Sequence, residues 1–174
     1  IEAYMLFYQA GDFKTCIKTC ETVLNLLDAK HQAMWNMIQF MNIIAYRYHG
    51  DAKKTKECLK NKPHQSNDDF YIMNQADFEI EMGCLNTALE KLDRLIENTE
   101  RIYGDSPPVI LSFTYITKAK ILREKGRLDA AQTLSQKGLN LAKNGEYMEA
   151  ILLGNLEHSL VLGSQKKYEA AFNT

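Results

Sequence analysis

The stretch GRLDAAQTLSQKGLNL, from Gly126 to Leu141, decides the fold because a helical pattern follows its opening glycine directly. Small or apolar residues recur on one face at helical spacing, at Leu128, Ala131, Leu134, Gly138, Leu141 and Ala142. The preceding residues 110–125, ILSFTYITKAKILREK, carry a second helical pattern. A glycine between two amphipathic helices predicts the turn of an αα-hairpin.

The same frame recurs along the chain. Turns are predicted at Gly11, Gly50, Gly83 and Gly126, with a degenerate fifth at Lys166, so the intervals are 39, 33, 43 and 40 residues. Five residues after each turn stands a small residue: Cys16, Thr55, Ala88, Ala131 and Ala171. A small residue lets two helices cross closely. Repetition at this period predicts an all-α, right-handed α-solenoid of stacked antiparallel hairpins, forming one domain over residues 1–174.

The chain resembles the tetratricopeptide repeat (TPR) family over its whole length, as four hairpins and the start of a fifth. The glycine turn, the apolar anchor after it and the small residue carry the resemblance. Seven residues before the turn, Ala76 and Ala119 match the family's small position, and the large position four before it is matched at Phe7, Tyr46, Leu122 and Leu162. Tyr4, Ile43 and Glu79 depart from the pattern. Three of the four intervals exceed the family's usual ~34 residues. Longer repeats of this kind are similar to those of the kinesin light chain and bacterial regulatory branches.

Composition places the chain among soluble globular proteins. It has 45% hydrophobic and 25% charged residues and a net charge of −1. No apolar run reaches the roughly 18 residues that a membrane span needs, and a general nucleic-acid binder would show a basic excess. Two basic runs are interpreted as solvated helix faces, with contact to a phosphate or an acidic partner as the alternative: Lys53, Lys54, Lys56, Lys60 and Lys62, and Lys118, Lys120, Arg123, Lys125 and Arg127.

The four cysteines, Cys16, Cys20, Cys58 and Cys84, do not have the spacing of a metal site. Cys16 and Cys20 lie one helical turn apart on an apolar stripe, and the chain has no CxxC motif. We expect buried thiols that act as small hydrophobes, with no metal and no cofactor. Reduced thiols suit a cytoplasmic location.

Helices are predicted from Phe13 to Leu27, from about His31 to His49, and from the turn at Gly50 to near Lys60. Two more are predicted from after Gly83 to about Tyr103 and from Tyr147 to about Leu162. Ser106 is predicted to cap the helix after Gly104, with Pro107 at its first position. The 147–162 helix has apolar residues on more than one side, so it is expected to need a partner on its far side. Because the chain opens inside a helical pattern, it is interpreted as a segment of a longer protein.

Motifs of catalysis are missing from the sequence, which contains no GxSxG, HExxH or Gly-rich phosphate loop. Glu157 and His158 are the nearest approach to an acid–base pair. Neighbours on a helix point about 100° apart, so His158 is interpreted as a surface histidine. An enzyme is not predicted.

Function is therefore expected from binding. The resemblance implies an inner surface lined by the first helix of each hairpin, and the residues predicted to bind a protein or peptide there are Phe40, Arg47, Met73, Asn74, Asp77, Phe113, Ile116, Lys120 and Arg123. Lys120 and Arg123 are hypothesised to receive carboxylates of an extended peptide, or else to pair internally with Asp77 or Glu81. The favoured role is a regulatory or sensory segment attached to a DNA-binding or signalling output domain. The alternative is a scaffold that joins subunits of a larger assembly.

Overall fold

The computed structural model describes residues 11–28, 31–60 and 69–173, and every regular element in these ranges is a helix. The chain forms two compact units, Ile1–Phe78 (unit 1) and Glu79–Thr174 (unit 2), which are described separately below. The predicted all-α class is confirmed. The predicted continuous solenoid over 1–174 stays a prediction.

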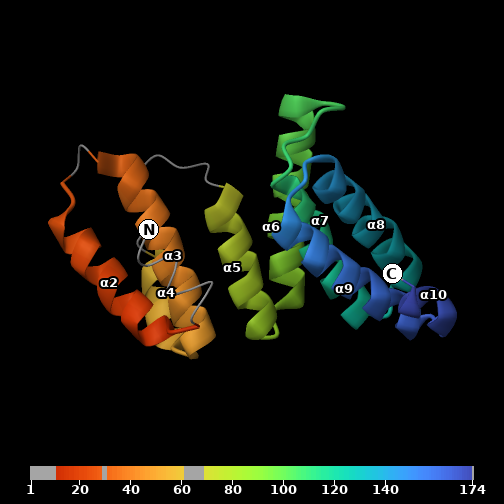
Figure 1. The fold of residues 1–174 in the computed structure, drawn as a ribbon, viewed down its shortest axis with the longest axis horizontal. Coiled ribbons are helices and arrows are strands. Elements are labelled where there is room, and N and C mark those ends of the chain that lie inside the picture. Colours follow the sequence, from red (N-terminus) through yellow and green to blue (C-terminus); the bar gives the residue numbers. More distant parts are fainter. Residues whose placement is uncertain (1–10, 29–30, 61–68, 174) are drawn as a thin grey trace. The chain divides into compact units, whose positions relative to one another are not determined.

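Unit 1 contains α2 (Phe13–Leu26), α3 (Gln32–His49), α4 (Ala52–Lys60) and the larger part of α5 (Asp69–Glu81). Unit 2 contains α6 (Leu85–Tyr103), α7 (Leu111–Glu124), α8 (Leu128–Asn144), α9 (Met148–Ser164) and α10 (Tyr168–Phe172). Figure 1 labels these helices in chain order. Consecutive helices contact each other from α2 to α4 in unit 1 and from α6 to α10 in unit 2.

The turns lie at the predicted positions. Gly50, Gly83, Gly126 and Lys166 all have positive φ, the left-handed conformation that closes a helix. At Gly126, its own N–H bonds to the carbonyl of Arg123 at 2.9 Å, and the next N–H, of Arg127, bonds to Leu122 at 2.8 Å. The other three turns repeat both bonds, so the degenerate fifth turn at Lys166 has the same geometry although it lacks glycine. Gly11 also has positive φ, but the helix predicted before it lies outside the described residues.

The small residues that follow these turns are where helices cross. Cys16, Thr55, Ala88 and Ala131 are fully buried, whereas Ala171 on the short α10 is half-buried. Helices α8 and α7 cross closely at Gly138, where an added Cβ would lie 2.9 Å from the carbonyl oxygen of Ser112. Contacts this short with backbone leave no room for a side chain at Gly138, which lies seven residues after the predicted crossing point Ala131.

The core of unit 1 confirms part of the cysteine prediction. Cys16 and Cys20 are buried on α2 against Ala45 and Tyr46 of α3. Burial raises the pKa of the Cys20 thiol to about 12, so it stays protonated. Cys84 is exposed and Cys58 only partly buried, so the burial expectation fails for Cys84, which stands in the turn before α6.

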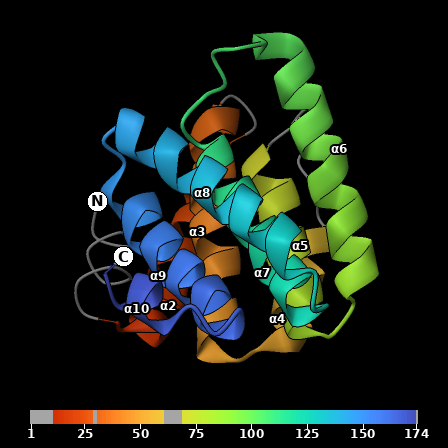
Figure 2. The same ribbon diagram turned by 90° about the vertical axis from the view of Figure 1, so that its right-hand side faces the viewer.

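The core of unit 2 connects α7 and α9, the first helices of two consecutive hairpins. Besides its contact with α8, α7 contacts α9 directly, and Figure 2 shows α8 and α9 side by side. Ile116 of α7 packs with Ala142 of α8 and Ala150 of α9. Leu122, Ala131 and Val161 form a second cluster across the same three helices.

The predicted cap at Ser106 is wrong, because α7 begins at Leu111 and Ile110 holds the cap position. The reason is local. Pro107 is followed by Pro108, and a residue before proline is pushed out of the helical region. The helix therefore starts only after Pro108, whose carbonyl accepts the N–H of Leu111 at 2.9 Å.

Candidate functional site

Three of the predicted binding residues come together in unit 1. Arg47 of α3 donates to Asn74 Oδ1 at 3.1 Å and to Asp77 Oδ2 at 3.2 Å, both on α5. The arginine side chain is only 10% exposed, so the contacts hold α3 against α5. Phe40 and Met73 are half-buried on the same two helices. Their role in binding stays a prediction.

In unit 2, Arg123 of α7 pairs with Glu157 of α9. Its Nε and Nη2 donate to the two carboxylate oxygens at 2.7 and 3.3 Å. Hydrogen bonding to Glu157 is the main cause that raises the pKa of Arg123. The hypothesised internal pairing therefore occurs at Arg123, but its partner is Glu157 of the following hairpin and not Asp77 or Glu81.

The other predicted residues of unit 2 differ in exposure. Ile116 is buried beneath α9, and Phe113 meets the ring of Tyr147 edge-on at 5.3 Å between centroids. Of Phe113, Ile116, Lys120 and Arg123, Lys120 is the exposed residue. Its ammonium group is therefore available to an acidic group.

The prediction that His158 is a surface histidine is wrong. His158 is 7% exposed, and its Nδ1 lies 2.8 Å from Ser135 Oγ of α8. Burial, followed by the charge of Lys143, lowers the pKa of His158. Glu157 is also buried but faces Arg123, so the two neighbours have separate partners, as their angular separation predicts.

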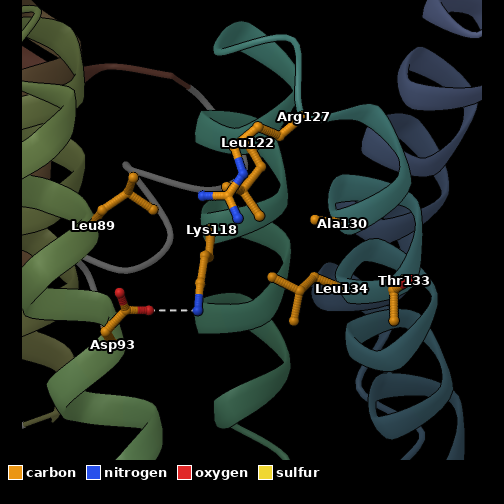
Figure 3. A pocket seen from close by; sticks show the side chains of 8 residues that line it. All are labelled: Leu89, Asp93, Lys118, Leu122, Arg127, Ala130, Thr133 and Leu134. Atoms are coloured by element: carbon orange, nitrogen blue, oxygen red, sulfur yellow. Dashed lines mark ion pairs between the residues drawn. The ribbon is translucent and has the colours of Figure 1, made fainter.

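A pocket of about 390 Å³ opens between α6, α7 and α8. One helical turn of each helix lines it, with the residues Leu89, Asp93, Lys118, Leu122, Arg127, Ala130, Thr133 and Leu134. In Figure 3, Lys118 points toward Asp93, with which it forms an ion pair, and Arg127 extends from the α7–α8 turn toward α7. The leucines supply apolar walls, and the guanidinium group of Arg127 is a cation beside them.

The chemistry of this pocket suits one apolar group that carries a carboxylate. Its volume is at the small end of the ~300–1,000 Å³ range of ligand pockets.

Two turns further along α6, Glu100 accepts hydrogen bonds from Tyr115 at 2.6 Å and Lys137 at 2.7 Å. The hydrogen bond from Lys137 is the main cause, and that from Tyr115 the second, of a lowered pKa of Glu100. Sequence reasoning placed Lys118 and Arg127 only in a basic run and did not predict a pocket with the leucines around them, because these leucines come from three different helices.

One face of α9 in unit 2 exposes several large apolar side chains. We call it the α9 row, and it consists of Glu149, Leu152, Leu153, Leu156 and Leu160. Its four leucines are 43% to 63% exposed. The opposite face of α9 is packed in the core, where Ala150, Gly154 and Val161 are buried. The apolar residues of this helix thus lie on two sides, one packed and one exposed, and the partner expected on its far side stays a prediction.

Within the described ranges, no group of three or more His, Cys, Asp or Glu side chains could hold a metal ion. None of the helices in these ranges has the length and apolar character needed to span a membrane. Comparison of the chain with protein-family models finds no match. Comparisons with curated proteins and with solved structures also find no significant match.

Proposed function

We propose that the chain is a TPR-like module of stacked helical hairpins that binds other proteins. Support comes from the repeated turn geometry at Gly50, Gly83, Gly126 and Lys166. Further support is the contact between α7 and α9, which are the first helices of consecutive hairpins. Stacking of this kind makes each repeat depend on its neighbours for a covered core.

The α9 row is the observation that carries the proposal. Four leucines of one helix face water over about two and a half turns, and burying a leucine contributes about 1.5–3 kcal/mol. Soluble domains seldom leave a contiguous apolar row of this kind uncovered unless it is a site of interaction. A protein surface that covers the row would gain this free energy.

The inner residues belong to the same proposal in a narrower form. Because Arg123 is already paired with Glu157, an acidic group of a bound peptide meets the exposed ammonium of Lys120. A cytoplasmic regulatory segment that receives a protein signal and passes it to an attached output domain is the role that fits a binding module best.

Selection of displayed peptides on the purified protein tests the proposal. Selected peptides should bind with Kd values of about 10 μM or tighter, near −7 kcal/mol. Binding should weaken in either Leu156→Glu or Lys120→Ala at unchanged melting temperature. Peptides that bind the heat-unfolded chain equally well, and are indifferent to both substitutions, would count against a folded binding module.

A further inference from the structure

The α9 row has the spacing of a helix-packing seam. Glu149, Leu153, Leu156 and Leu160 follow one another at intervals of 4, 3 and 4 residues. Side chains at this spacing lie along one stripe of a helix and interlock with those of a second helix. A flat or extended partner would not interlock with side chains at intervals of 4, 3 and 4 residues. The partner that fits this stripe is therefore a helix.

The register of the repeat shows which residues of α7 correspond to the row. The turns at Gly126 and Lys166 have the same hydrogen bonds, and α7 and α9 each end two residues before their turn, at Glu124 and Ser164. Positions in the two helices therefore correspond at an interval of 40 residues. Leu153 corresponds to Phe113.

By the same interval, Leu156 corresponds to Ile116. These positions of α7 are already covered, and the helix that covers them is α9. Ile116 packs against Ala150, and a Cβ added to Gly154 would lie 3.2 Å from Ile116 Cδ1. The covering helix thus meets Ile116 with small residues of its own, whereas Phe113 meets the ring of Tyr147, the residue that precedes α9. Leu153 and Leu156 offer the same large residues with no cover among the described residues of unit 2.

We propose that the α9 row binds an amphipathic α-helix of a partner protein, which places small residues over Leu156, a larger apolar residue over Leu153 and a lysine or arginine beside Glu149. This inference rests on the proposed protein-binding function and names the partner of that same surface. The interface continues the α7–α9 packing by one further helix, with the partner helix in the place that α9 takes on α7.

Glu149 sets the charge of the partner. Its counterpart 40 residues earlier is the apolar Val109, which precedes α7 and lies against Gly145. Glu149 is exposed in the uncovered row, but its surroundings already remove part of its water, and this desolvation raises the pKa of Glu149. A helix that covers the seam must therefore supply a cation to the carboxylate.

The same charge argues against a second copy of the chain as the occupant. Helix α9 contains no lysine and no arginine, so two α9 rows packed together would leave both Glu149 carboxylates without a cation. They would also set leucine against leucine, without the small residues that let α9 approach α7. A different protein with a basic amphipathic helix is the better fit.

Two synthetic helical peptides of about 20 residues test the inference. Both carry alanine at the positions of Ala150 and Gly154 and apolar residues at those of Tyr147 and Ile151, and they differ in having lysine or glutamate opposite Glu149. By fluorescence anisotropy, the lysine peptide should bind more tightly than the glutamate peptide. Leu156→Glu should weaken its binding at least about tenfold, the effect expected at a central interface residue. Ile102→Glu, at an exposed apolar residue of α6, is the matched control and should leave binding unchanged.

Reversing the charge of Glu149 is the decisive experiment. Glu149→Lys should invert the preference, so that the glutamate peptide binds more tightly. The inference is overturned if neither peptide binds, if Ile102→Glu weakens binding as much as Leu156→Glu, or if sedimentation shows self-association that Leu156→Glu abolishes. If displayed peptides bind elsewhere on the protein while both helical peptides fail, the protein-binding function stands and only this partner is excluded.

Discussion

Arg47 and Arg123 hold the same position in two hairpins, three residues before the glycine turn, and their partners differ. Arg47 shares its donors between the amide of Asn74 and the carboxylate of Asp77, whereas Arg123 gives both donors to Glu157. Asn74 and Glu157 also correspond, because each stands nine residues before its own turn. One repeat geometry thus accommodates an amide in unit 1 and a charge in unit 2.

The difference shows how burial changes what an ion pair contributes. The side chain of Asp77 is 35% exposed, but that of Glu157 is only 7% exposed. Water can solvate Asp77 if its partner is lost, so its pair contributes little. A buried carboxylate has no such replacement, and the loss of either partner leaves an uncompensated charge.

The largest effect is therefore expected for Glu157→Ala. The substitution leaves Arg123 without its carboxylate and should lower the free energy of unfolding by about 2–4 kcal/mol. Hydrogen exchange of the α7 and α9 amides measures the loss within unit 2. Glu124→Ala, at an exposed glutamate one residue after Arg123, should change the same amides by less than about 0.5 kcal/mol. Equal effects of the two substitutions would refute the stabilising role of the pair.

A double-mutant cycle sharpens the comparison. The coupling energy between Arg123 and Glu157 should be about 1–3 kcal/mol, as for residues that share a buried network. The coupling between Arg47 and Asp77 should be below about 1 kcal/mol. Urea unfolding of the single and double alanine variants gives both values. If the two couplings are the same, burial does not distinguish the pairs.

Asp77→Ala should have a smaller effect, about 1 kcal/mol or less, because Asn74 continues to accept a hydrogen bond from Arg47. Trp35 of α3 is the single tryptophan of the chain, so its fluorescence follows the unfolding of unit 1. Asn74→Ala serves as the comparison variant. A greater loss from Asp77→Ala than from Glu157→Ala would reverse the predicted order.

The smallest expected effect is a pH dependence that belongs to unit 2. The pKa of His158 is lowered by burial in the folded protein, so below the unfolded value of about 6.5 the unfolded chain takes up the proton more readily. Unfolding is then favoured, and stability falls as the pH drops below about 6.5. His158→Gln should flatten this part of the stability profile measured by urea unfolding. A steeper fall in the variant would show that other groups are responsible.

Local features of the fold were predictable from the sequence. The turn at Lys166 was found without a glycine, because the spacing to the small residue and to the neighbouring helices marks the turn even where the side chain is unfavourable. Ala88 and Ala131 were identified as crossing points for the same reason. Such signals depend on residues within a few positions of one another.

Partners distant in sequence were not predictable. Arg123 and Glu157 are 34 residues apart, and Ser135 and His158 are 23 apart. Helical periodicity reports which face of a helix is apolar, but it does not report which polar side chain of another helix reaches that face. The burial of His158 was missed because it depends on the packing of α8 against α9, and the pocket around Arg127 was missed because three helices build it. The binding roles of the inner residues stay predictions.

The reaction rates of the buried thiols of α2 report how often α2 separates from α3 in unit 1. Cys16 and Cys20 are inaccessible in the folded state, and burial raises the pKa of both. A disulfide reagent therefore reacts with them only during transient opening of α2 from α3, at a rate set by the opening equilibrium. Exposed Cys84 reacts without opening and serves as the internal standard for reagent reactivity. The ratio of the two labelling rates reads out the fluctuations of unit 1 without any added probe.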